Sequence, residues 1–233
     1  MRQHYHEELE DINNCLVEMA NSVGSAMSKA TTALLDADVA LADLVIAGDG
    51  QVDAARESLE QRCFTLLAQQ QPVATDLRTI TAATRIVADL ERMGDLAVHV
   101  AKVARMRFPD HAVPLEVRPI FLEAGHVAER LVAQTAAVIA KLDVEAAKHL
   151  EADDDLMDQL HRQLFRELLS KDWPHGMEAA IDITLLGRFY ERFADHAVSV
   201  ARRVVYLVTG ERGDPGSRCQ ETSTEYRSKP LRS

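Results

Sequence analysis

The chain has 233 residues, of which 47% are hydrophobic, 27% charged and 5% aromatic, and its formal net charge is −11. Such an acidic chain is a poor candidate for binding nucleic acid, because contacts with phosphate groups need a basic face. The composition is that of a globular protein, and no apolar run approaches the ~20 residues that cross a bilayer. We expect a soluble protein that reaches a membrane only through its partners.

Helical periodicity dominates the chain, and no segment alternates in the manner of a strand. Three helices are expected before the loop FPDHAVP and three after it. Their approximate ranges are 5–39, 38–70, 72–107, 115–141, 143–171 and 174–210. The third helix follows the break QQP, with Pro72 suited to its first turn. The polar segment 211–233 lacks periodicity and predicts a disordered tail.

One stretch of sequence occurs twice. Positions 91–101 read ERMGDLAVHVA and positions 191–201 read ERFADHAVSVA, so that seven of eleven positions are identical. A spacing of about a hundred residues indicates the duplication of a whole domain rather than a short solenoid repeat. Because long helices joined by short breaks lie antiparallel, we expect an all-α protein built of two three-helix bundles, at 1–108 and 114–210.

The three cysteines, Cys15, Cys63 and Cys219, match the spacing of neither a CxxC motif nor a zinc finger. The N-terminal segment does not have the pattern of a signal peptide. These two observations predict reduced thiols and a cytoplasmic location.

Each copy of the repeat carries two acidic residues four positions apart, which places both carboxylates on one face of a helix. One such pair is weak evidence, because the chain has several and most must be solvated. The helical hairpins strengthen the case. In each copy, a second acidic pair lies on the preceding helix, about as many residues before the break between the two helices as the first pair lies after it. At 1.5 Å per residue, the two pairs then lie at the same height. The four pairs are Asp49 with Asp53, Glu91 with Asp95, Asp154 with Asp158, and Glu191 with Asp195.

Four carboxylates that face one another repel strongly unless a cation lies between them. Ligation by oxygen alone suits Mg²⁺, Ca²⁺, Mn²⁺ or iron, so the pattern predicts a metal site in each copy. The alternative is that the pairs point to solvent or are neutralised by Arg92 and Arg192, since equal height does not establish an equal face. His99, His161 and His196 are expected to be surface or supporting residues rather than ligands.

Two longer segments point to a known family. The segment QQPVATDLRTI, followed by DLERMGDLAVHVA, resembles the signature of PhoU-type phosphate-signalling regulators, and GRFYERFADHAVSVARRVVYLVTGE resembles the second repeat of that family. The resemblance covers about residues 4–211 and is closest to actinobacterial members. It implies two pseudo-symmetric three-helix bundles whose E/DxxxD motifs bind iron, zinc or another divalent ion such as manganese or magnesium. Matched position by position, these motifs fall on the eight carboxylates named above.

The resemblance also implies a function. Proteins of this family act in the cytoplasm as negative regulators of the phosphate regulon. They link a phosphate ABC transporter, with its ATPase, to a membrane sensor histidine kinase. We therefore expect a metal-binding adaptor that forms a homodimer, and not an enzyme, because the sequence has no nucleophile elbow, P-loop or catalytic Cys/His arrangement.

The second copy departs from the family pattern. Ala194 stands where the motif often has glycine, the DLR opening is replaced by PHGMEAAIDI, and Phe189 stands in place of Asp89, so the two sites need not be alike. The rival function is a carboxylate-bridged metalloenzyme, either an oxidase or a phosphohydrolase. A di-iron oxidase would need Glu-x-x-His pairs, and EAAKH at 145–149 is one residue too long. A purely structural bundle is the third alternative.

Overall fold

The computed structural model describes residues 2–70 and 72–211, and every regular element in these ranges is a helix. The predicted tail therefore lies outside the described residues, except for Glu211. The helices are α1 (Arg2–Asp36), α2 (Val39–Gln70), α3 (Ala74–Arg107), α4 (Arg118–Lys141), α5 (Val144–Leu168) and α6 (Gly176–Thr209). The all-α class and the number and order of the helices agree with the sequence-based prediction.

Some predicted helix ends are wrong by a few residues. Pro72 precedes α3 instead of occupying its first turn, because the helix begins at Ala74. The fourth helix begins at Arg118, three residues later than expected, since Pro119 rather than Pro114 takes the first turn. The fifth helix ends at 168 rather than 171, and the backbone N–H groups of residues 169 and 170 bond to carbonyls of its last turn.

Aspartates begin α2 and α5, the second helix of each copy. A carboxylate oxygen of Asp38 accepts a hydrogen bond from the backbone N–H of Leu41 at 3.0 Å. Asp143 accepts bonds from the N–H groups of Glu145 and Ala146, both at 3.0 Å. Both side chains thus satisfy N–H groups that have no partner within their helix.

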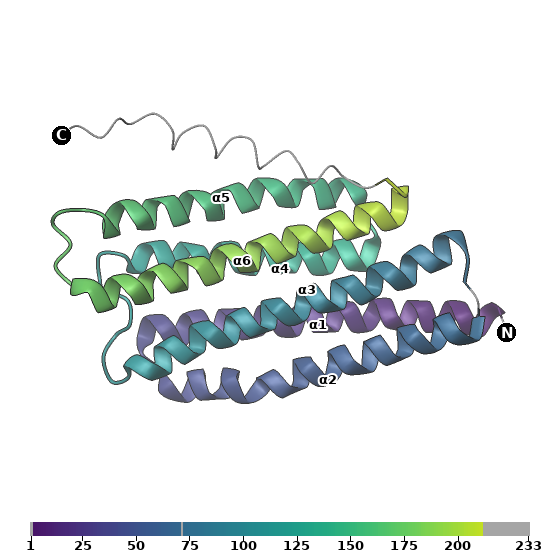
Figure 1. Cartoon of the computed structure of the whole chain (residues 1–233), viewed down its shortest axis with the longest axis horizontal. Coiled ribbons are helices and arrows are strands. Elements are labelled where there is room, and N and C mark those ends of the chain that lie inside the picture. The colour runs from purple at the N-terminus through teal and green to yellow at the C-terminus, as the bar shows by residue number, and fades with distance from the viewer. Residues whose placement is uncertain (1, 71, 212–233) are drawn as a thin grey trace, which may run out of the picture.

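The six helices form two bundles, α1–α3 and α4–α6, which lie side by side (Figure 1). The bundles meet where α1 packs on α4 and α3 packs on α6. Within the described residues, α2 contacts helices of the first bundle alone and α5 contacts helices of the second bundle alone. The molecule therefore has four inner helices and two outer ones, with α2 and α5 on opposite sides (Figure 1).

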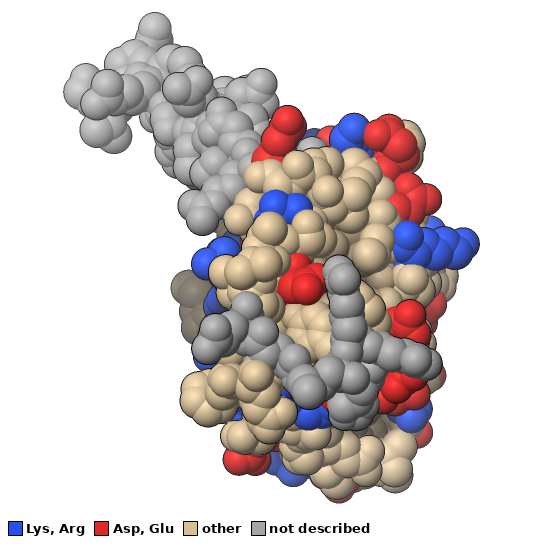
Figure 2. Space-filling model, turned by 90° about the vertical axis from the view of Figure 1, so that its right-hand side faces the viewer, with Lys and Arg blue, Asp and Glu red and all other residues tan. Residues whose placement is uncertain are grey.

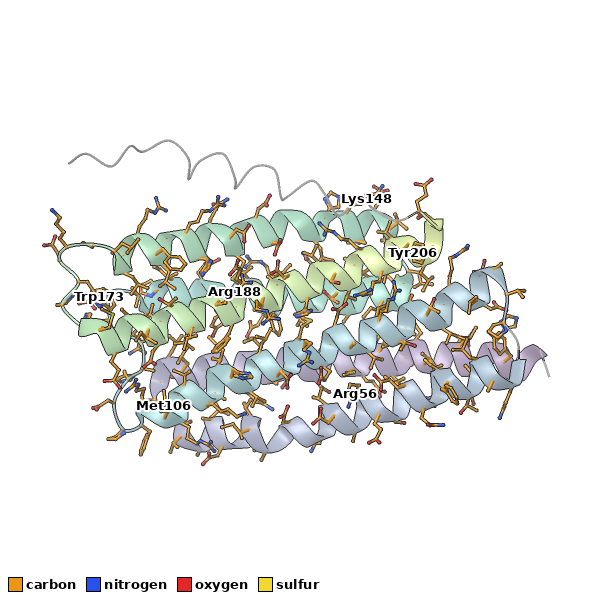
Figure 3. All side chains as sticks on the ribbon, in the orientation of Figure 1. Arg56, Met106, Lys148, Trp173, Arg188 and Tyr206 are labelled. Carbon is orange, nitrogen blue, oxygen red and sulfur yellow. The ribbon has the colours of Figure 1, made fainter. Side chains whose placement is uncertain are left out.

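The two ends of the molecule differ in their side chains. Figure 2 looks onto the end where α2 stops and α3 starts, and its visible surface mixes both charges around uncharged residues rather than forming a basic patch. Exposed apolar side chains at this end are Phe64 of α2, Leu77 of α3 and Val73, which directly precedes α3. At the opposite end lie Met106, in the last turn of α3, and Trp173, in the loop between α5 and α6 (Figure 3). The Trp173 indole donates a hydrogen bond to the carbonyl of Gly176 at 3.0 Å.

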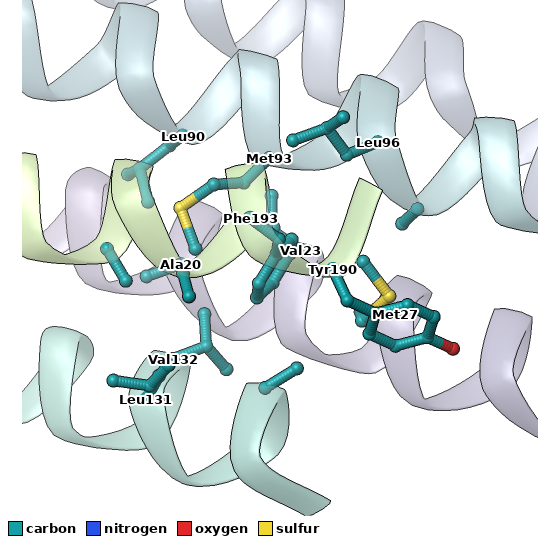
Figure 4. Packing of buried hydrophobic residues seen from close by; sticks show 14 of the residues in the cluster. Ala20, Val23, Met27, Leu90, Met93, Leu96, Leu131, Val132, Tyr190 and Phe193 are labelled. Atoms are coloured by element: carbon teal, nitrogen blue, oxygen red, sulfur yellow. The ribbon is translucent and has the colours of Figure 1, made fainter. Parts of the chain in front are cut away.

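The core runs through both bundles without a break. Val23 of α1, Met93 of α3, Leu131 of α4 and Phe193 of α6 are all fully buried. They belong to one continuous cluster of apolar side chains, and Figure 4 shows that they converge from the four inner helices. The bundles thus share a core instead of each closing its own.

The α1–α4 contact repeats itself about the pseudo-symmetry axis. A β-carbon added to Gly24 of α1 would collide with the side chain of Val132 of α4. In the reciprocal position, a β-carbon added to Gly125 of α4 would lie 2.6 Å from Cγ2 of Thr31 of α1. By a shift of 101 residues, Gly24 corresponds to Gly125, and Thr31 corresponds to Val132. Glycine is needed at both positions because the two helix backbones approach closely.

We expect Gly24→Ala to lower the free energy of unfolding by about 1–3 kcal/mol, because the added methyl group overpacks a filled contact. Val132→Ala on its own also destabilises, since it leaves a cavity. The double variant should recover part of both losses, because the smaller side chain makes room for the methyl group. Urea unfolding of the four proteins measures this coupling, and strictly additive losses would contradict the close contact.

Candidate metal centre

The structure brings the four predicted carboxylates of the first copy close together. Asp49 and Asp53 extend from α2, and Glu91 and Asp95 extend from the neighbouring α3. Burial raises the pKa of Asp49, and the negative charges of Asp53 and Asp95 raise it further. Burial also raises the pKa of Glu91, with Asp95 adding to the effect. The two acidic pairs are therefore near enough to repel each other, as their equal height along the hairpin predicts.

An arginine from the same helix partly offsets this repulsion. Nη1 of Arg92 lies 3.0 Å from Oδ2 of Asp95, and its Nε lies 3.6 Å from Oε2 of Glu91. The Arg92 side chain is 62% exposed, so it can leave these carboxylates at little cost to packing. Between the two pairs the helices approach closely, since a β-carbon on Gly94 would lie 3.2 Å from Cγ1 of Val52.

The second copy is arranged differently, around Arg188. This arginine forms an ion pair with Glu191, and the charges of Asp158 and Asp195 contribute to raising its pKa. Figure 3 labels it in the middle of α6. Asp154 is 2% exposed, whereas its counterpart Asp49 is only half-buried. Three carboxylates of the second copy thus act on a cation from their own chain, which the sequence analysis did not identify.

The histidines have the supporting positions that the sequence predicts. Nδ1 of His161 lies 3.3 Å from Oε2 of Glu191. Nδ1 of His99 is bonded to the backbone carbonyl of Asp95 at 2.6 Å, which takes that nitrogen away from any role as a ligand. His196 points away from the carboxylates of the second copy and toward Asp89 of the first bundle.

The donor chemistry of both groups fits a hard cation, since all eight predicted ligands are carboxylates. Within the described residues, however, no three side chains of His, Cys, Asp or Glu converge closely enough to hold an ion. Binding would require the four carboxylates of the first copy to turn toward a common point and Arg92 to withdraw. The four carboxylates of the first copy thus lie near one another, but they are not yet arranged around one point where an ion could bind.

A polar network that the sequence analysis missed joins α3 to α6. Asp89 of α3 is only 7% exposed. Its carboxylate accepts hydrogen bonds from Ser199 Oγ at 3.0 Å and from Arg203 Nε at 2.6 Å, and it lies 3.0 Å from His196 Nδ1. Burial alone would raise the pKa of Asp89, but the bonds from His196, Arg203 and Ser199 lower it below its ordinary value. This carboxylate anchors one bundle to the other.

At the pseudo-symmetric position, a contact between two rings takes the place of this network. Asp89 and Ser199 correspond, by a shift of 100 residues, to Phe189 and His99. The Phe189 and His99 rings lie 5.2 Å apart between the same two helices. The two copies have therefore diverged in matched pairs, with an ionic contact on one side of the axis and a ring contact on the other. The sequence differences at 89/189 and 99/199 are parts of one change in the contact between α3 and α6.

A second ionic contact joins the same helices nearer the end of the molecule. Arg107, the last residue of α3, donates from Nε to Asp182 of α6 at 2.6 Å and also pairs with Glu178. Asp182 is one of the few buried charged residues. The α3–α6 contact is thus held by ion pairs at its middle and at one end.

The fold and the site together define a class: an all-helical protein of two repeated bundles, each with carboxylates gathered between its last two helices. The PhoU domain family matches residues 16–104 and 121–204, which lie within the two bundles. The chain belongs to the PhoU family.

Two curated relatives match nearly the whole chain. It is 50% identical over 210 residues to the Mycobacterium tuberculosis protein named phosphate-specific transport system accessory protein PhoU homolog 2, covering 90% of this chain and 99% of the relative. It is 49% identical over 222 residues to PhoU homolog 1 of Mycobacterium leprae, covering 94% of this chain and 100% of the relative.

Solved structures have the same fold. The crystal structure of PhoU from Pseudomonas aeruginosa superposes with a TM-score of 0.80 at 30% identity, covering 89% of this chain and 100% of that one. The phosphate transport system regulatory protein PhoU from Streptococcus pneumoniae superposes with a TM-score of 0.81 at 26% identity, covering 90% and 99%. Among the described helices, none contains a stretch both long and apolar enough to cross a bilayer.

Proposed function

We propose that this chain is a cytoplasmic negative regulator of phosphate uptake. In this proposal it acts as a metal-binding adaptor between a phosphate ABC transporter and a membrane sensor histidine kinase. The observation that carries the proposal is the 50% identity, over nearly the full length of both chains, to a protein named as an accessory of phosphate-specific transport. The same names favour an adaptor over the rival metalloenzyme, since the relatives are called accessory and regulatory proteins.

Deletion of the gene tests the regulatory role. In medium rich in phosphate, the deletion strain should express phosphate-uptake genes that the parent strain keeps repressed, and a plasmid carrying the full chain should restore repression. Co-purification of the tagged chain with the transporter ATPase and with the histidine kinase tests the two partners. Unchanged expression in the deletion strain would overturn the proposal.

The homodimer that we also expect is tested by measuring the mass of the purified protein in solution.

The metal would be held by Asp49, Asp53, Glu91 and Asp95 in the first copy and by Asp154, Asp158, Glu191 and Asp195 in the second. A bound di- or trivalent ion supplies the positive charge that lets carboxylates gather without repulsion. Burial is the main cause of the raised pKa of Asp49 and of Glu91, and the neighbouring negative charges, which add to it, support the first site. The ion pair of Arg188 with Glu191, together with the charge effects of Asp158 and Asp195 on Arg188, supports a different occupancy of the second site.

We expect the double variant Asp49→Asn, Asp95→Asn to lose most of the metal bound by the first copy, because it removes one ligand from each helix. Elemental analysis of protein purified without chelator, and the rise in melting temperature on adding Mn²⁺, measure the effect. Asp43→Asn is the matched control, since Asp43 is an exposed carboxylate on the same helix, paired with Arg105 at 3.4 Å. Equal metal content in the double variant and the control would contradict the assignment.

A further inference from the structure

The two copies differ by one charge beside their carboxylates. By the shift of 100 residues that relates Glu91 to Glu191, Arg188 of α6 corresponds to Ala88 of α3. Arg188 precedes Glu191 by three residues, so the two side chains lie on the same face of the helix. Alanine brings no charge to the carboxylates of the first copy. The second copy thus has a cation that the first copy lacks at this position.

The helix contact beside Arg188 brings this residue close to α5 as well. A β-carbon added to Gly187 would lie 2.6 Å from Cδ2 of Leu164 and 3.1 Å from Cδ2 of His161, so α5 and α6 approach closely there. Asp158 lies three residues before His161, which is about one turn of α5. Arg188 therefore extends from the contact between the two helices, within about one turn of an acidic residue on the other helix.

Arg188 interacts with carboxylates from both helices. It forms an ion pair with Glu191 of α6. The hydrogen bond and the charge of Glu191 raise the pKa of Arg188, and the charges of Asp195 on α6 and Asp158 on α5 add to this effect. A guanidinium group has five N–H donors, so it can serve more than one carboxylate at a time.

The first copy is neutralised from a different position. The ion pairs of Arg92 are with Glu91 and Asp95, both on its own helix. Its counterpart in the second copy, Arg192, is exposed and forms no ion pair within residues 2–70 and 72–211. In the first copy negative charge stays crowded, because carboxylates of both acidic pairs add to burial in raising the pKa of Asp49. The arginine that neutralises the carboxylates thus stands at different positions of the repeat in the two copies.

We propose that Arg188 is a built-in counter-cation of the second copy, which holds the carboxylates of α5 and α6 together without metal and competes with an ion for them. The Arg188 side chain is 52% exposed, so the guanidinium can swing out without disturbing the core. An ion binds there only when the guanidinium leaves, because the two positive charges repel each other. The first copy therefore takes up metal before the second. This role of Arg188 rests on the metal binding proposed above and adds the residue that sets the order of the two sites.

The second copy can be measured alone in a chain whose first site is removed by Asp49→Asn and Asp95→Asn. In that chain Arg188→Gln should bind Mn²⁺ at least about tenfold more tightly than the same chain with Arg188, because a like charge is removed from the site. Isothermal titration calorimetry measures the affinity, and elemental analysis counts the bound ions. The absence of any gain in affinity would overturn the proposal, whatever the unaltered chain binds.

Two control variants in the same chain separate the position of the charge from its presence. Arg188→Lys keeps a cation at the position and should leave the binding of Mn²⁺ weak. Arg192→Gln removes an exposed arginine one turn further along α6 and should change the affinity by less than about twofold, because solvent screens that charge. Equal gains in Arg192→Gln and Arg188→Gln would refute a specific role of Arg188.

The reciprocal change tests the first copy. Ala88 is exposed, so Ala88→Arg in the otherwise unaltered chain places an arginine beside the first site without entering the core. It should weaken the binding of Mn²⁺ by about tenfold, and an unchanged affinity would contradict the proposal. If the unaltered chain binds no Mn²⁺ but Arg188→Gln gains it, the metal assignment of the first copy fails and the role of Arg188 stands. If the unaltered chain binds Mn²⁺ and Arg188→Gln gains nothing, the role of Arg188 alone fails.

The role of Arg188 as a counter-cation also has a readout without metal. In buffer with EDTA, Arg188→Gln should lower the melting temperature more than Arg192→Gln does, because it leaves carboxylates of the second copy without their counter-charge. Circular dichroism measures the melting temperature and confirms that both variants are helical. Equal melting temperatures of the two variants would contradict the proposal.

Discussion

Asp89→Ala is expected to lower the free energy of unfolding by about 3 kcal/mol, which makes it one of the most damaging single changes in the protein. The substitution leaves Arg203, which is 28% exposed, and His196 without their buried carboxylate at the contact between the bundles. The estimate is at the low end for a broken buried ion pair, because water still reaches Arg203. Denaturant unfolding followed by circular dichroism measures the loss.

Asp43→Ala is the control for this change. It also removes an aspartate paired with an arginine, but both side chains of that pair are about half exposed. Exposed pairs contribute about 0–1 kcal/mol. Similar losses in the two variants would mean that the network of Asp89 contributes no more than an ordinary surface pair.

The effect of Asp89 depends on pH in a definite direction. Its pKa in the folded protein lies below the ordinary value of 3.8, so the unfolded chain binds a proton at a higher pH than the folded chain does. The stabilisation is therefore complete above the pKa of the unfolded state and is lost as the pH falls through the folded pKa. The gap in stability between the unaltered chain and Asp89→Asn should be constant near neutral pH and should narrow below about pH 4.

Phe193→Ala is expected to cost about 3–5 kcal/mol, because it removes a fully buried ring where the two bundles meet. Since this core is shared by four helices, thermal unfolding should remain a single transition that shifts to lower temperature as a whole. Differential scanning calorimetry measures both the shift and the number of transitions. Two separate transitions would show that each bundle has its own stable core.

Phe64→Ala is the matched control for the loss of a ring. Phe64 lies on α2 and is 66% exposed, so its removal should change stability by less than about 0.5 kcal/mol. A large effect would mean that the outer helix contributes more to the core than its exposure indicates.

The sequence predicted the features that depend on distance along the chain. The rise of a helix is nearly constant, so counting residues from the breaks near Pro72 and Pro174 placed the acidic pairs level on neighbouring helices. In the first copy, the mutual charge effects of Asp49, Asp53, Glu91 and Asp95 agree with that placement. That these residues bind metal stays a prediction.

The features that depend on how the helices face one another were not predicted. The ion pair of Arg188 with Glu191 depends on side-chain direction, which the spacing of residues along the chain does not give. Asp89 was noted as a difference from Phe189, but its partners lie more than a hundred residues away.

The separation of α2 and α5 from each other has a consequence for how the molecule moves. Each outer helix is attached to two inner helices of its own bundle, and the middle of α2 reaches the core only through half-buried side chains such as Ile46 and Val52. That segment can open locally at a free energy well below that of global unfolding. Such an opening would leave the contacts among the other five helices in place.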